Sequence, residues 1–182
     1  MKITVIGRGN VGGGLAEMWQ RAGHQVDALG SDGGDASASD VVVVAVPGNA
    51  IDDALGRITG IEGKPVIDTT NAARGRAGDF PSLAHQVKSH TKGPVAKAFN
   101  LNFAALYDQI SDQRLPPSNF FCGDEEVRPF AEQLSRDAGY EPVYAGGLEN
   151  ARAMEDFLAV VISALRGGLG PFFIRVAKPG ER

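Results

Sequence analysis

The sequence predicts an α/β fold with a doubly wound, mainly parallel sheet and a small helical extension at the C-terminal end. Three observations support this. Short apolar segments alternate with segments of helical periodicity. Residues 41–46 are apolar without interruption, as expected for a strand covered on both faces of a parallel sheet. A glycine-rich turn separates the first apolar segment from the first helical one. In such a fold, ligands bind at the carboxyl ends of the strands.

The first element, residues 1–6, is predicted as a strand that leads directly into the glycine-rich turn. The turn consists of Gly7, Arg8, Gly9, Asn10, Val11 and Gly12. Gly7 permits a sharp turn, Gly9 permits close approach of backbone N–H groups to a diphosphate, and Gly12 lets the following helix pack on the sheet. The helix N-terminus favours an anion through its unpaired N–H groups and its dipole. We therefore predict a Rossmann-type dinucleotide site at residues 7–12.

The remaining elements follow in alternation. Further strands are predicted at residues 25–29, 41–46, 65–67, 95–99, 119–122 and 141–144, and helices at 11–22, 47–58, 127–138 and 148–165. Residues 71–93 are predicted as a long connection without regular structure, which favours a functional loop. We divide the chain into a dinucleotide-binding domain, residues 1–146, and a C-terminal extension and tail, residues 147–182, which is rich in Gly and Pro at its end.

The composition excludes several functional classes. The formal net charge is -4 and no basic stripe is present, which argues against nucleic-acid binding. The single cysteine, Cys122, cannot form an internal disulfide and has no partner at metal-ligand spacing, so we expect no metal site. No apolar segment reaches membrane-spanning length and no signal peptide is recognisable, so we expect a cytoplasmic protein with a small-molecule substrate.

Candidate residues for the nicotinamide end of a dinucleotide lie at or just after the carboxyl ends of three predicted strands. They are Val46, Pro47, Asn71, Ala72 and Asn100. Their amides and carbonyls are candidates to bind a carboxamide. Hydride transfer requires two stacked rings more than ionisable side chains, so we assign no catalytic residue.

Three basic residues are candidates for binding the second substrate. Arg74 and Arg76 lie in the long connection and could bind an anionic group, although an ordinary solvated surface explains them equally well. Lys97 lies near the end of a predicted strand. It is either a charge beside the second substrate or the partner of a buried acid.

The chain resembles the deazaflavin (coenzyme F-420) dependent NADP oxidoreductase family over most of residues 1–160. The motifs that carry the resemblance are GRGNVG at 7–12, AVP at 45–47, IDTTN at 67–71, KAFN at 97–100, CGDEE at 122–126, DAGY at 137–140 and GGLENAR at 146–152. The resemblance implies a homodimeric Rossmann reductase that moves hydride between NADP(H) and a second redox partner. Coenzyme F-420 is one candidate partner, but the family also contains reductases that do not use it.

One position departs from the family pattern. Family members place Ser-Arg after the second strand, where the arginine holds the 2′-phosphate of NADP, whereas this chain has Ser31 and Asp32. Asp32 lies at the distance expected for a carboxylate that binds the ribose of NAD. Against this, Ser31 can donate to a phosphate and Arg8 can supply the positive charge. The resemblance favours NADP, and NAD remains the alternative.

The second substrate stays open at this stage. A deazaflavin, a flavin or a small carbonyl or imine compound would each suit a reductase of this kind. A non-catalytic sensor or interaction module that binds NAD(P) is the alternative from another functional class, because the small C-terminal extension offers little wall for a second substrate.

Overall fold

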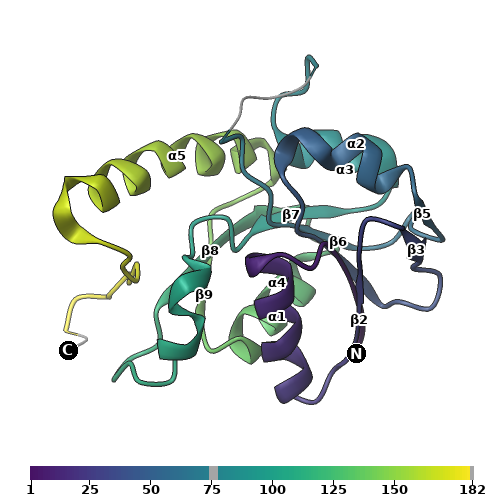
Figure 1. Cartoon of the computed structure of the whole chain (residues 1–182). Coiled ribbons are helices and arrows are strands. Elements are labelled where there is room, and N and C mark those ends of the chain that lie inside the picture. Colours follow the sequence, from purple (N-terminus) through teal and green to yellow (C-terminus); the bar gives the residue numbers. More distant parts are fainter. Residues whose placement is uncertain (74–77, 181–182) are drawn as a thin grey trace.

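The computed structural model describes residues 1–73 and 78–180 of the chain. Within these residues the main sheet has seven strands in the order β2-β1-β4-β6-β7-β8-β9 (Figure 1). They are β1 (Lys2–Ile6), β2 (Gln25–Leu29), β4 (Val41–Val44), β6 (Val66–Asp68), β7 (Val95–Ala98), β8 (Ser118–Gly123) and β9 (Glu141–Tyr144). All neighbouring strands are parallel except β7 and β8. The predicted mainly parallel, doubly wound sheet is confirmed.

Helices cover both faces of this sheet. Figure 1 shows α1 (Asn10–Arg21) and α4 (Arg128–Asp137) on one face, and α2 (Ile51–Leu55), α3 (Leu83–Thr91) and α5 (Ala151–Ala164) on the other. Strand β4 illustrates why the apolar run is continuous. Val41 and Val43 belong to the cluster beneath α1, whereas Val42 and Val44 belong to the cluster beneath α2 and α3. Both faces of the strand are therefore buried, as its sequence predicts.

A residue of the first helix ties the two helices of one face together. Trp19 is fully buried, its indole N–H donates to the carbonyl of Leu134 in α4 at 2.9 Å, and its ring meets Phe99 edge-on at 5.7 Å. Its role is packing and hydrogen bonding within the core rather than ligand stacking.

Three local predictions were wrong. Residues 71–93 are not wholly irregular, because α3 occupies 83–91 with the Ser82 hydroxyl as its N-cap. The second predicted helix ends at Leu55, and Ile58 instead begins the short strand β5 (Ile58–Thr59). That strand pairs with β3 (Gly34–Asp35), which lies between the predicted strands 25–29 and 41–46, where no strand was predicted. Both strands have two residues, which is too short for sequence periodicity to reveal them.

The C-terminal segment returns to the body of the protein after α5. A π-helical turn (Leu165–Leu169) ends the helix, and the chain then folds back so that Ser118 N–H donates to the carbonyl of Ile174 at 2.7 Å. The ring of Phe172 packs edge-on against Phe103 at 5.4 Å between centroids. The tail thus docks on its own chain.

Candidate functional site

The glycine-rich turn lies at the carboxyl end of β1, where a doubly wound sheet binds its ligands. Gly7 has a φ of 112°, a conformation that L side chains rarely adopt, and a Cβ there would collide with the carbonyl of Ala45. At Gly12 a Cβ would collide with the carbonyl of Gly7, so only glycine lets α1 lie this close to the strand. Both glycines are therefore required by the protein's own packing.

Gly9 differs because its surroundings are open. A Cβ at this position would meet no protein atom within 4 Å. Gly9 is the N-cap of α1, and neither a side-chain cap nor an acidic residue occupies the first turn of the helix. The first intrahelical hydrogen bond runs from Gly13 N–H to the Gly9 carbonyl at 2.7 Å, which leaves the preceding N–H groups of residues 10–12 for a ligand. This cradle fits a diphosphate.

Gly14, which lies within α1 just beyond the glycine-rich turn, is required by the packing of the protein itself. A Cβ on Gly14 would lie 2.5 Å from the ring of Tyr107 in the 3-10 helix Ala104–Gln109 (η2). The close approach of that aromatic ring, rather than of a ligand, explains why a helix-weakening residue stands here.

A cavity of about 290 Å³ extends from the turn toward the end of β2. Its lining includes Gly7, Arg8, Ser31, Val46, Pro47 and Asp53. Arg8 folds over the end of β2, where its Nε donates to the carbonyl of Ala28 at 2.6 Å. This is the position of the adenosine ribose in a Rossmann site. Ser31 lines the cavity, whereas Asp32 is exposed and is not among its lining residues.

The predicted nicotinamide residues Asn71 and Asn100 lie together. Asn71 Nδ2 donates to the Asn100 carbonyl at 2.7 Å, and Asn100 Nδ2 donates to Asn71 Oδ1 at 3.1 Å and to the Met154 carbonyl of α5 at 3.2 Å. Asn100 Oδ1 is buried and accepts no hydrogen bond from the residues that the structure describes. A buried acceptor at this edge of the sheet matches the amide donor of a nicotinamide carboxamide.

The backbone before Asn100 is strained. Phe99 has a φ of 60°, although it is not glycine, and its N–H donates to Asn119 Oδ1 at 3.0 Å. Its buried ring packs between Trp19 and Tyr140. This packing holds the left-handed conformation that turns the chain from β7 toward Asn71. Ala72 is half-buried. Like Val46, it packs against the apolar cluster on the face of the sheet opposite to the ring of Phe99.

Lys97 is a fully buried residue of β7. Its Nζ lies 2.6 Å from Asp68 Oδ2 and 3.0 Å from Glu155 Oε1, and it donates to the Thr70 carbonyl at 2.8 Å. Asp68 is fully buried and Glu155 nearly so. Glu155 also accepts from the N–H of Leu83 at the start of α3. Of the two predicted roles of Lys97, the structure supports the partner of buried acids. The other two substrate candidates, Arg74 and Arg76, lie outside the described residues.

The sequence leaves open whether Glu155, on the last helix, faces the active-site cleft or solvent, and the structure places it on the buried face beside Ala151 and Met154. One residue near the site was missed. Arg57 lies against Ser31, where its Nη1 donates to the Ser31 carbonyl at 2.8 Å. Only its four-residue spacing from Asp53, typical of a helical ion pair, could have been noticed.

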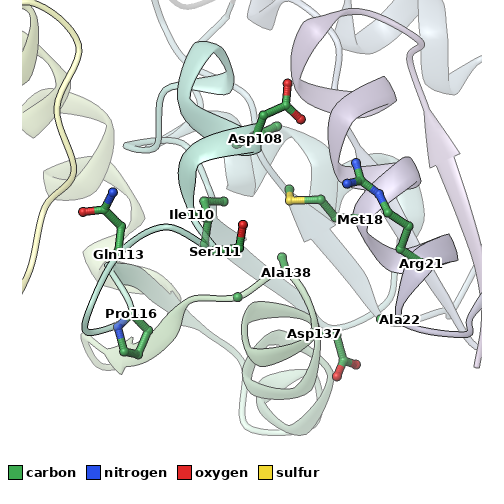
Figure 2. A pocket seen from close by; sticks show the side chains of 12 residues that line it. Met18, Arg21, Ala22, Asp108, Ile110, Ser111, Gln113, Pro116, Asp137 and Ala138 are labelled. Carbon is green, nitrogen blue, oxygen red and sulfur yellow. The ribbon is translucent and has the colours of Figure 1, made fainter.

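A larger cavity, of about 520 Å³, lies elsewhere (Figure 2). It is lined by the C-terminal end of α1, including Met18 and Arg21, and by Asp108 and Asp137. Met18, Arg21 and Ala22 place this cavity toward the C-terminal end of α1, whereas the glycine-rich turn lies at the N-terminal end of the helix. None of the residues that the sequence assigns to the cofactor line this cavity.

No group of three or more His, Cys, Asp or Glu side chains in residues 1–73 and 78–180 is arranged to hold a metal ion. Over the same ranges, no helix combines the length and the apolar character needed to cross a membrane.

No profile of a protein family matches the chain, and no curated protein matches it in sequence. Solved structures do match. The proposed F420-dependent NADP reductase from Arthrobacter sp. FB24 superposes with a TM-score of 0.78 at 23% identity, over 98% of this chain and 100% of that one. A reductive aminase from Aspergillus terreus, in complex with NADPH and ethyl levulinate, gives 0.68 at 15% identity over 92% of this chain.

The same fold recurs in an imine reductase from Streptomyces aurantiacus, with a TM-score of 0.65 at 17% identity over 91% of this chain. The chain spans 63% of the length of this imine reductase and of the reductive aminase, whereas it spans the whole Arthrobacter protein. The chain therefore has the Rossmann-type fold that these proteins share.

Proposed function

We propose that the protein is an NADP(H)-dependent reductase of the coenzyme F-420-dependent NADP oxidoreductase type, which transfers hydride between NADP(H) and a second redox partner. The observation that carries this proposal is the cradle at Gly9, where open space faces the N–H groups of residues 10–12. Backbone donors of this kind bind a diphosphate without a cationic side chain.

The residues of the chain would divide the work along the cofactor. The turn binds the diphosphate, and Arg8 and Ser31 lie beside the adenosine ribose, in a cavity that Val46 and Pro47 also line although the sequence assigned both to the nicotinamide end. Ala72 keeps its assignment to the nicotinamide end, next to Asn71. When bound, NADPH supplies the hydride. Asn71 and Asn100 orient the carboxamide, and the strained backbone at Phe99 fixes the position of Asn100. Orientation of two rings with water excluded is the main requirement of hydride transfer.

We further propose that the protein works as a homodimer whose second subunit covers the outer half of α5. Residues 157–165 contain no charged side chain, yet Phe157 and Val160 are 44% and 58% exposed. An apolar cavity of about 410 Å³, lined in part by Leu101, Met154 and Phe157, lies under this helix and next to Asn100. A helix that is apolar on all sides is normally buried.

The test is a hydride-transfer assay with purified protein and NADPH. Coenzyme F-420, a flavin, and small ketones and imines are offered in turn, and oxidation of NADPH is followed by its absorbance. Turnover with any of these supports the proposal and names the partner class. Binding of NADPH without turnover across the set would favour the alternative, a non-catalytic sensor. A substrate carrying a carboxylate that loses affinity in Arg74→Ala and Arg76→Ala, at unchanged cofactor affinity, would favour an imine or ketone reductase.

A further inference from the structure

Backbone contacts of Arg57 hold this residue next to the loop that follows β2, where the ribose site is predicted. Arg57 follows α2 and precedes β5, and its carbonyl accepts from Gly34 N–H at 3.2 Å. A Cβ on Gly33 would collide with that same carbonyl, so the loop after β2 lies directly on Arg57. The β3–β5 pairing that follows fixes the register of the two segments.

The guanidinium of Arg57 reaches Ser31, the residue before the position that departs from the family pattern. Nη1 donates to the Ser31 carbonyl at 2.8 Å, and Nη2 pairs with Asp53 Oδ1 at 2.7 Å. A guanidinium has five N–H donors, so these two contacts leave others for a ligand. The side chain of Arg57 is 50% exposed, and although it does not itself line the cavity, both of its partners, Ser31 and Asp53, do.

Arg8 approaches the same loop from the other side. Its guanidinium lies about 3.8 Å from the position of a Cβ on Gly30, the residue before Ser31. Two guanidinium groups therefore contact the segment formed by Gly30 and Ser31, and Asp53, the partner of Arg57, lines the cavity with Arg8. Arg57 is paired with Asp53, and Asp32 follows Ser31, so the positive groups available to a ligand here are the free N–H donors of the two guanidinium groups rather than a net positive charge.

We infer that Arg57 is a specificity-determining residue that recognises the 2′-phosphate of NADP(H), with Arg8 and the Ser31 hydroxyl as its partners. This inference rests on the proposed function, because it assigns a role within the same cofactor site. The charge that relatives carry in the loop after the second strand is supplied in this chain by the connection between α2 and β5. Arginine suits the task because its planar fork can bind a phosphate with two parallel hydrogen bonds.

The experiment measures dissociation constants of NADPH and NADH, by titration calorimetry, for the unmodified protein and for Arg57→Ala. We expect the unmodified protein to prefer NADPH. Arg57→Ala should weaken NADPH binding about 10- to 100-fold, the range for loss of a charge-assisted hydrogen bond, and change NADH binding less than about threefold. Arg57→Lys should retain part of the preference, and the preference should fall with ionic strength.

The matched control is Arg21→Ala. Arg21 is also exposed and also pairs with a carboxylate four residues earlier, Glu17, but it lies at the far end of α1. It should leave both constants unchanged. Equal loss of NADPH and NADH binding in Arg57→Ala would assign Arg57 a structural role and overturn the inference, as would unchanged binding of both. If the unmodified protein binds neither coenzyme, the proposed function itself fails.

Discussion

Aspartate at position 9 is expected to abolish NADPH binding while leaving the fold intact or slightly more stable. Gly9 is the N-cap of α1, its φ is -73°, and no side chain caps the helix. Aspartate is a favoured N-cap and its charge suits the helix dipole, which together contribute a few tenths to about 1 kcal/mol. For a domain of this size that corresponds to a rise in Tm of at most about 4 °C.

The effect on binding has the opposite sign and is larger. The new carboxylate would stand in the open space at Gly9, on the side that faces the N–H groups proposed to bind the diphosphate. At a separation of about 4 Å and an effective dielectric constant of about 20, two unit charges repel by about 4 kcal/mol, which is close to a 1,000-fold loss of affinity. Calorimetric titration with NADPH and thermal unfolding of the same sample measure both quantities.

Two further variants make the result specific. Gln20→Glu makes the same change in net charge at an exposed position near the other end of α1 and should bind NADPH normally. Gly12→Ala should instead destabilise the fold, by about 1–3 kcal/mol, because its Cβ meets the Gly7 carbonyl. If folded Gly9→Asp binds NADPH within about threefold of the unmodified protein, the diphosphate does not lie at this turn.

Three other predictions concern the core and the assembly. Lys97→Met removes the ammonium that Asp68 and Glu155 contact and should cost about 3–5 kcal/mol in denaturant unfolding; a change below 1 kcal/mol would contradict the buried-pair reading. Burial raises the pKa of the Cys122 thiol to about 12 from 9.0 in the unfolded chain. The free energy of unfolding should therefore be unaffected by this thiol below pH 9 and should fall between pH 9 and 12. A thiol reagent should react with Cys122 at pH 8 only after denaturation, and rapid labelling of the folded protein would refute this. Phe157→Glu should shift the protein from dimer to monomer in sedimentation velocity, and an unchanged dimer would place the interface elsewhere.

The parts of the fold that the sequence predicted are those whose signal is local. The uninterrupted valines of β4 report burial on both faces, and the glycines of the turn report contacts within a few residues of themselves. Helix α3 was missed although Ser82 caps it and Leu83 and Val87 form its buried side, because Lys88 and the histidines beside them resemble a solvated loop.

The parts of the site that the sequence missed depend on contacts between distant segments. Arg57 reaches Ser31 only because β5 pairs with β3, a two-residue ribbon with no periodicity of its own. Glu155 reaches Lys97 only because α5 packs across the end of β7. The sequence could predict that Asn71 and Asn100 lie close together, because parallel strands end at a common edge of the sheet. It could not predict their hydrogen bonds, because these depend on the left-handed turn at Phe99.

The central claim is that NADPH binds at the turn between β1 and α1, and backbone amide chemical shifts test it most directly. In a titration of ¹⁵N-labelled protein with NADPH, the largest shifts should belong to residues 8–12 and to Ser31. Shifts confined to the cavity of Figure 2, at residues such as Asp108 and Ser111, with residues 8–12 unmoved, would contradict the account.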